Sequence, residues 1–239
     1  GQINTWNTSQ ITNMFALFRD KTTFNSNISN WDVSNVTTMN TMFRECNAFN
    51  QNIGGWNTGN VEDMRYMFYG AEAFNQPIGT WNVSKVTNMF RMFDSAILFN
   101  QNINAWNVGN VTSMSFMFDA ATAFNQPLNS WNVSSVIDMR FMFYQASVFN
   151  GDISSWNVSG VTYMGNMFYN AYAFNQDLSS WDVSNVTDME RIFNSTSLST
   201  TNYDAILNGW SALTVQPNVP FGTGTIPYTA AAATAHNTL

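Results

Sequence analysis

The stretch WNVSKVTNMFRMFDSAILFNQNINA, residues 81–105, is one copy of a unit that fills most of this chain of 239 residues. Its first residue belongs to a set of tryptophans that recur every 25 residues without an insertion or deletion. A fixed period of this length is typical of a supersecondary unit that buries its apolar face by stacking on copies of itself. The sequence therefore predicts one elongated repeat array. The set comprises Trp6, Trp31, Trp56, Trp81, Trp106, Trp131, Trp156 and Trp181.

Two segments of the unit predict secondary structure. Val86, Met89 and Phe93 recur at helical spacing, so a helix that faces the core is expected there, with Ser84 as its cap. Ile103 to Val108 has apolar residues at intervals of three and two, which favours a short strand or extended turn. Together these patterns predict an α/β fold of about eight coils.

The repeat pattern fails after Asn194, because Ser199 stands where a Phe is expected. We divide the single domain into repeats over 1–198 and a C-terminal cap over 199–239. The cap is expected to contain a helix over 202–210, a loop over 217–227 and an Ala-rich helix over 229–239. Such a cap would seal the apolar end of the array.

Two polar positions recur along the array. We interpret both as structural ladders, in which stacked side chains bond to one another and to the turn backbone of the next coil, rather than as a ligand site. The asparagine ladder comprises Asn25, Asn50, Asn75, Asn100, Asn125, Asn150 and Asn175, and the threonine ladder Thr37, Thr87, Thr112, Thr162 and Thr187.

Composition disfavours several partners. The net charge is −7, only 10% of residues are charged, and the eight Lys and Arg residues form no run. Nucleic acid and anionic membranes are therefore not expected as partners. The single cysteine, Cys46, occupies a slot filled by Ala in later coils, and we expect it to be a small buried core residue.

Catalytic and metal chemistry are also not expected. The only histidine, His236, lies near the chain end, so a serine or cysteine nucleophile has no obvious base and most zinc sites are ruled out. Asp63, Asp138 and Asp188 share one slot but are two or more coils apart, and no Asp-x-Asp-x-Asp-Gly calcium loop is present. We predict no enzyme, no metal and no cofactor.

If a partner binds the array, the residues that contact it are expected at the positions where the coils differ in sequence. The position ten residues after each Trp is expected to point away from the apolar stripe, and the position three residues further on adds more rings. Aromatic residues and Arg are enriched at interface centres, so this ridge is the first docking candidate, with Arg65 and Arg140 beside it. The alternative is that the segment is not helical and the rings are ordinary core. The ridge comprises Tyr66, Tyr69, Arg91, Phe116, Phe141, Tyr144 and Tyr169.

A polar row beside the tryptophans is the second candidate. It could accept sugar hydroxyls, with Trp rings stacking on the sugar if they are exposed. We expect those rings to be mostly buried, which weakens the glycan hypothesis. The row comprises Asp32, Asn57, Asn82, Asn107, Asn132, Asn157 and Asp182.

The segment Trp31 to Met39, followed by Met-Phe and Phe-Asn-Gln, and the matching segment Trp181 to Met189 resemble the 25-residue repeat of BspA-type leucine-rich-repeat surface proteins and mycoplasma lipoproteins. The resemblance covers residues 1 to about 198, and residues 202–210 resemble the segment that closes such arrays. It implies a right-handed leucine-rich-repeat-like solenoid on a bacterial surface or in an adhesin. It supplies no catalytic residues.

These observations lead to an expected function. We expect a non-catalytic, extracellular or cell-surface interaction module that binds a protein or peptide through one face. The alternatives are a glycan-binding module and a structural spacer. Because Gly1 aligns with mid-repeat, the chain is expected to be a monomeric domain of a larger protein, with no membrane insertion of its own.

Overall fold

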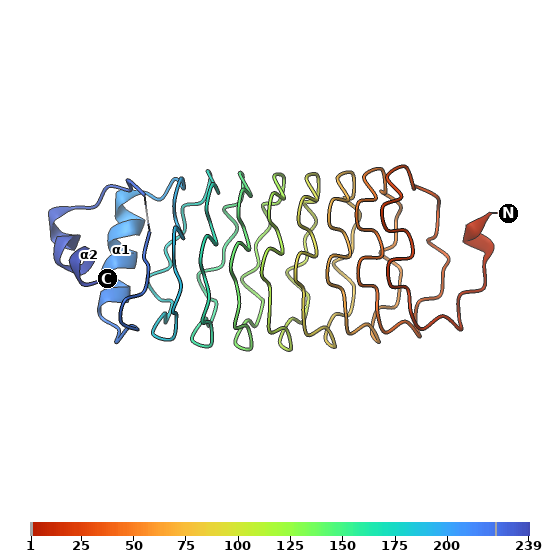
Figure 1. Cartoon of the computed structure of the whole chain (residues 1–239), viewed down its shortest axis with the longest axis horizontal. Helices are drawn as coiled ribbons and strands as arrows, with labels where there is room; N and C mark the ends of the chain where they lie inside the picture. Colours follow the sequence, from red (N-terminus) through yellow and green to blue (C-terminus); the bar gives the residue numbers. More distant parts are fainter. Residues whose placement is uncertain (1, 223) are drawn as a thin grey trace.

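The computed structural model describes residues 2–222 and 224–239, which form a stack of similar coils closed at one end by short helices (Figure 1). Isolated parallel β-bridges join equivalent residues of successive coils, from Asn13↔Thr38 to Tyr163↔Asp188. Bridge partners are 25 residues apart, so the sequence period is the length of one coil.

The predicted α/β leucine-rich-repeat-like solenoid is wrong. The described coils consist of turns and isolated bridges and contain neither an α-helix nor an extended strand, so no sheet forms. Helical structure in the described chain is confined to its two ends. It comprises the 3₁₀ helix η1 (Ile3–Thr5), the α-helix α1 (Thr200–Ser211), the 3₁₀ helix η2 (Ala230–Ala232) and the α-helix α2 (Ala233–Thr238).

Left-handed backbone explains why the expected helix does not form. In each coil the residues ten and fourteen positions after the Trp have positive φ, for example 58° at Phe116 and 51° at Ala120. A left-handed residue cannot continue an α-helix. Instead, Met117 N–H donates to Met114 C=O at 3.0 Å, closing a β-turn. Successive turns place every third residue on one side, as a helix would, and the predicted apolar stripe is indeed buried.

The expected strand is also absent. At 103–108 the chain turns, and Trp106 N–H donates to Ile103 C=O at 3.0 Å, so only the turn part of that prediction is correct. The Ile103 carbonyl accepts a second bond from the next coil, from Trp131 Nε1 at 3.0 Å. Coils are therefore joined here by a side chain, and a backbone ladder does not form.

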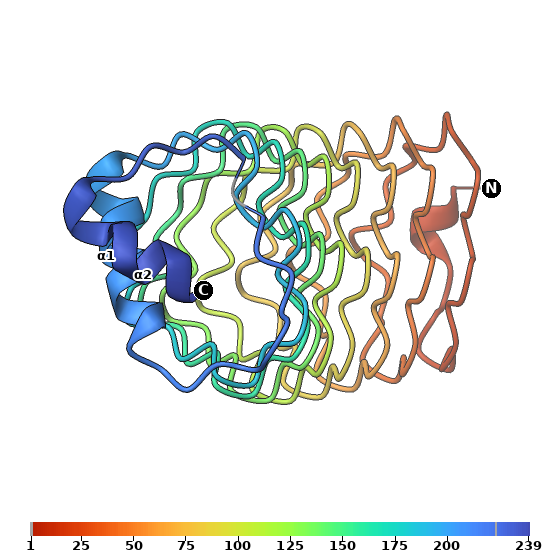
Figure 2. The same cartoon turned by 60° about the vertical axis from the view of Figure 1, so that its left-hand side comes forward.

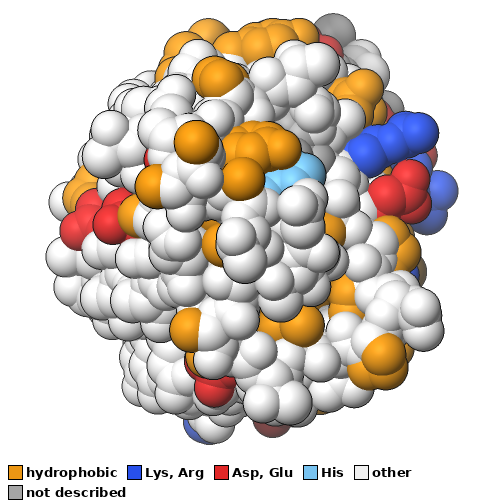
Figure 3. Space-filling view, turned by 90° about the vertical axis from the view of Figure 1, so that its left-hand side faces the viewer, with side chains coloured by type: hydrophobic (Ala, Val, Ile, Leu, Met, Phe, Trp, Pro, Cys, Tyr) orange, Lys and Arg blue, Asp and Glu red, His pale blue; other side chains and the backbone are white. Residues whose placement is uncertain are grey.

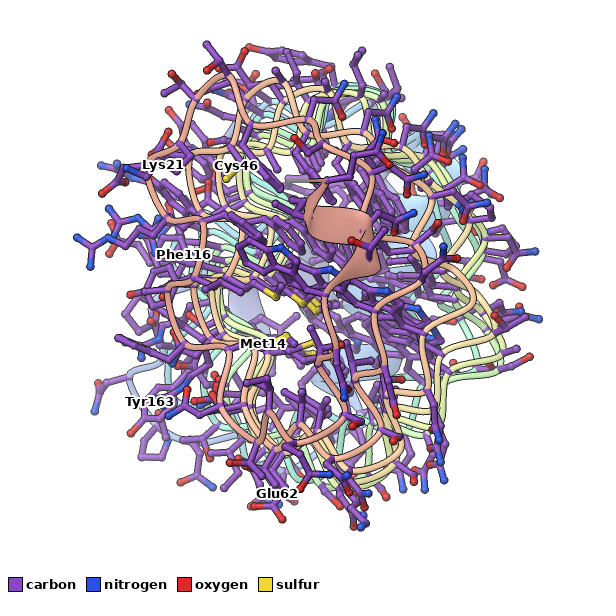
Figure 4. All side chains as sticks on the ribbon, turned by 90° about the vertical axis from the view of Figure 1, so that its right-hand side faces the viewer. Met14, Lys21, Cys46, Glu62, Phe116 and Tyr163 are labelled. Carbon is purple, nitrogen blue, oxygen red and sulfur yellow. The ribbon has the colours of Figure 1, made fainter. Side chains whose placement is uncertain are left out.

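The core runs along the axis of the stack. Trp31 to Trp181 are at most 5% exposed, which confirms the prediction that these rings are buried. Most adjacent tryptophans stack, with 6.3 Å between the ring centroids of Trp131 and Trp156. Cys46 is buried as expected, and burial raises the pKa of its thiol to about 12. Figure 4 shows Met14 and Cys46 inside the ring of coils.

The cap lies against the last coil (Figure 2) and continues its side-chain ladders. Trp210 in α1 donates from Nε1 to Leu178 C=O at 3.0 Å, as the repeat tryptophans from Trp31 to Trp181 do to equivalent carbonyls. Asn202 Nδ2 donates to Asn175 Oδ1 at 2.9 Å. The predicted helix is confirmed but begins at Thr200, with Ser199 as its cap. The predicted C-terminal helix appears as η2 followed by α2. At the other end, Trp6 is 58% exposed.

Candidate functional site: the aromatic ridge

The first docking candidate forms a row of half-buried side chains on one side of the stack, which we call the aromatic ridge. The view along the axis places Phe116 on the same side as Lys21 and Tyr163 (Figure 4). The ridge consists of Tyr66, Tyr69, Arg91, Phe116, Phe141, Tyr144 and Tyr169.

The ridge rings pack against one another from coil to coil. The ring centroids of Phe116 and Phe141 are 4.4 Å apart with nearly parallel planes, and those of Tyr144 and Tyr169 are 5.1 Å apart. Arg91 places its Cζ 4.0 Å from the Phe116 centroid, within the range of a cation–π contact. The segment is not helical, as the alternative hypothesis assumed. The rings nevertheless remain partly exposed and are absent from the buried core.

Four ridge residues stand on unfavourable backbone. Tyr66, Arg91, Phe116 and Phe141 have φ of 55° to 58°, in the left-handed region where Gly and Asn are preferred. An ordinary L-residue there costs about 1 kcal/mol. The equivalent Asn166 also has φ of 58°, so Asn fits this position in the same fold.

Each of the two arginines beside the ridge is held by the carboxylate two residues before it in the chain. Arg65 donates from Nε and Nη2 to the two carboxylate oxygens of Asp63 at 3.0 and 2.8 Å. Arg140 binds Asp138 in the same way, and its Cζ lies 4.8 Å from the Tyr163 ring centroid. These guanidinium groups are fixed in position at the edge of the ridge.

Two carboxylates interrupt the ridge between Tyr69 and Tyr144. Asp94 is 3% exposed, pairs with Arg91 and accepts a hydrogen bond from Ser95 Oγ at 2.8 Å. Burial raises the pKa of Asp94 despite these partners. Burial and the neighbouring Asp94 also raise the pKa of Asp119 to about 7, while the Arg91 charge opposes the rise.

The polar row beside the tryptophans has a different construction. Each of its Asn or Asp residues is exposed, and its Oδ1 accepts the backbone N–H two residues later, as in Asn82 with Ser84 at 3.1 Å. This Asx turn already engages the oxygen that a sugar hydroxyl would approach. The interior Trp rings nearby are buried and offer no stacking platform. All seven residues share this bond, namely Asp32, Asn57, Asn82, Asn107, Asn132, Asn157 and Asp182.

Both polar ladders are structural, as predicted. Asn100 Oδ1 accepts from Asn125 N–H and from Gln126 Nε2, each at 3.0 Å. Thr112 Oγ1 donates to Thr87 C=O at 3.1 Å. The ladders therefore hold successive coils together with their polar atoms occupied.

Other chemistry-bearing groups do not converge. His236 stacks on Tyr228 in the cap, with ring centroids 4.2 Å apart. Figure 3 shows this single histidine on a cap surface that is mostly polar and uncharged. In the described residues, no group of three or more His, Cys, Asp or Glu could hold a metal ion. No helix in the described part of the chain is long and apolar enough to span a membrane.

Sequence reasoning missed the carboxylate pair and the left-handed positions. Asp94 and Asp119 occupy the same slot as Tyr69 and Tyr144, so alignment of the coils could have found them. Gly70, with φ of 65°, indicates one left-handed position of the coil, since Gly adopts positive φ more readily than other residues. Several other exposed apolar side chains were also not predicted, among them Ile97, Leu98, Val148 and Tyr172.

The fold and the ridge together define a repeat protein whose coils are built from turns and whose side chains vary on one side. A family model described as a Mycoplasma protein of unknown function, DUF285, matches residues 1–106 and again residues 91–210. The chain belongs to this family, and its repeat is of the mycoplasma type. Comparison with the curated proteins and with the solved structures gives no match.

Proposed function

We propose that this chain is a non-catalytic interaction module of a bacterial cell-surface protein and that it binds a protein or peptide partner through the aromatic ridge. The kinship with BspA-type surface proteins and the role as an adhesin module belong to this proposal. In it, the ridge side chains carry recognition, and the rest of each coil provides a rigid support.

The observation that supports the proposal most directly is that aromatic side chains of the ridge are partly exposed although they stand on energetically unfavourable left-handed backbone. Phe116 and Phe141 are partly exposed and stand at positions where Asn would fit with less strain, as Asn166 shows. Residues in such sparsely populated backbone regions cluster at functional sites. Aromatic residues and Arg are also the types that contribute most to binding energy at protein interfaces.

The test is a peptide and glycan array probed with the wild type and with the double variant Phe116→Asn/Phe141→Asn. Asn keeps the left-handed backbone and removes both rings. We expect a peptide ligand that the wild type binds and the double variant loses. Retention of every hit by the double variant would contradict the ridge as the binding surface.

A glycan-binding function is the second candidate, because the polar row presents seven exposed Asn or Asp side chains at regular spacing. The matched variant is Asn107→Ser/Asn132→Ser, since Ser can form the same turn without the amide. Glycan hits that disappear in this variant, with peptide hits unchanged, would favour this candidate. Complete absence of hits for the wild type would favour a spacer.

A further inference from the structure

Ring–cation contacts divide the aromatic ridge into two halves. In the first half, Arg44 Cζ lies 5.2 Å from the Tyr69 centroid and Arg91 Cζ lies 4.0 Å from the Phe116 centroid. In the second half, no guanidinium of the described chain lies over the remaining three rings. Arginines therefore stack on rings of the first half of the ridge but not on those of the second half. These three rings are Phe141, Tyr144 and Tyr169.

Asp119 lies at the start of this second half. Its neighbour Ala120 donates its N–H to Tyr144 C=O at 2.7 Å, so Asp119 and Tyr144 occupy equivalent places in adjacent coils. In the described chain the Asp119 carboxylate forms no ion pair and no side-chain hydrogen bond. Arg91, whose charge lowers the pKa of Asp119, is paired with Asp94 instead.

A carboxylate without a cation therefore stands beside rings without a cation. When Asp94 and Asp119 are both ionised, the single Arg91 leaves this group with an excess negative charge. The whole chain carries a net charge of −7, which favours the approach of a basic partner. The excess negative charge and the rings without a cation both favour a positively charged side chain that can stack on an aromatic ring.

Resting on the function proposed above, we propose that the partner places an arginine side chain between Asp119 and the rings of Phe141 and Tyr144. Arginine fits better than lysine because its planar guanidinium can stack on a ring and hydrogen-bond a carboxylate at the same time. The ridge face already uses this arrangement, since Arg140 pairs with Asp138 while lying over Tyr163. The partner is thus a protein with an exposed arginine-bearing segment.

Protonation of Asp119 gives the proposal a pH signature. The charged groups that face it are Asp94, which raises the pKa of Asp119, and Arg91, which lowers it. Its pKa near 7 means that the carboxylate is largely protonated at pH 5.5 and ionised at pH 8. Because a guanidinium favours the ionised form, affinity should increase as the pH rises through 7.

The probe is the peptide acetyl-Gly-Arg-Gly amide, compared with its lysine and citrulline counterparts by NMR titration of the backbone amides. Citrulline keeps the shape of arginine and removes the charge. We expect the arginine peptide to shift the amides of Asp119, Ala120 and Tyr144 and to bind most tightly. Equal affinity for citrulline, or shifts confined to other coils, would overturn the proposal, and equal affinity for lysine would overturn the choice of arginine.

Two charge-matched variants locate the contact. Asp119→Asn should weaken binding of the arginine peptide roughly fivefold at pH 8 and little at pH 5.5. It should fold, because Asn194 stands in the same slot of the last coil. Asp152→Asn makes the same charge change where Asn52 and Asn102 stand in other coils, and it should bind like the wild type. An Asp119→Asn variant that binds like Asp152→Asn at pH 8 would contradict the arginine contact.

The array distinguishes this inference from the function on which it rests. Consider an array peptide that the Phe116→Asn/Phe141→Asn variant no longer binds. If its binding is insensitive to Asp119→Asn and to replacement of its arginines by citrulline, the ridge is still the binding surface, but the arginine contact is wrong. If none of these changes alters binding, both proposals fail. Loss of binding in each case supports both.

Discussion

The tryptophan side and the ridge side of each coil follow the same 25-residue period in different ways. On the tryptophan side the side chains repeat as strictly as the backbone, and Trp106 is 2% exposed. On the ridge side the backbone repeats, with φ of 55° at Arg91 and 58° at Phe116, while the side chains vary. The side chains of the tryptophan side are therefore needed for the fold, whereas those of the ridge side can vary and are available for another role.

This difference predicts where substitutions are costly. A side chain of the tryptophan side contacts the coils before and after it, so its loss disturbs two interfaces. A ridge side chain contributes part of its surface to its neighbours and the rest to solvent. Variants of matched size on the two sides should then differ in their effect on the free energy of unfolding.

The largest expected effect is that of Trp106→Ala. The ring lies 6.2 Å from the Phe93 centroid, and Nε1 donates to Ile78 C=O at 3.0 Å, so both a packed ring and a buried bond are lost. The cost should be about 3–5 kcal/mol in the free energy of unfolding, measured by urea denaturation. Tyr172→Ala, at a side chain 56% exposed, is the control and should change it by less than about 0.5 kcal/mol. Similar losses in the two variants would contradict the assignment of the tryptophans as the structural side.

A smaller loss is expected from Asn100→Ala. Its Oδ1 accepts from Asn125 N–H and Gln126 Nε2, and Ala leaves both donors without this acceptor. A hydrogen bond contributes about 0.5–1.5 kcal/mol, so the loss of these two bonds between coils should cost roughly 1–3 kcal/mol. Asn82→Ala, which removes one exposed bond to Ser84, should lose less than 1 kcal/mol, about the cost of a surface change. Equal melting temperatures for the two variants would show that the asparagine ladder does not join the coils.

Asp119→Asn should change stability in the opposite direction. Folding raises the pKa of Asp119 from its ordinary value of 3.8 to about 7, so the folded state binds more protons than the unfolded state between these values. The free energy of unfolding therefore falls as the pH rises from about 4 to 7. At pH 8 the variant should be more stable by on the order of 1 kcal/mol, a rise in Tm of roughly 3 °C, with no gain at pH 4. A gain that is independent of pH would contradict this account.

Much of the core was predictable because periodicity reports which residues are buried, whatever the backbone does. The spacing of Val86, Met89 and Phe93 correctly predicts that they are buried, although the chain forms no helix there. Turns closed by a bond between residues three apart imitate the helical spacing. The asparagine ladder was also predictable, since one polar residue type recurring at the coil period has a neighbour of its own kind to bond.

The candidate site was predictable only in part. The ridge residues were found because rings recur at one variable position, but their left-handed backbone was hidden by residues such as Phe116 and Arg91, which rarely adopt it. The contact of Arg91 with both Asp94 and Phe116 depends on neighbouring coils and on side-chain direction. Periodicity carries no information on that direction once the helix is replaced by turns.

The measurement that tests the central claim most directly is the thermal unfolding of Phe116→Asn/Phe141→Asn beside the wild type. The account predicts that relief of left-handed strain offsets most of the lost ring packing, so Tm should change by no more than roughly 3 °C. A fall of Tm as large as that of Trp106→Ala would contradict the account, because the ridge would then be part of the structural core.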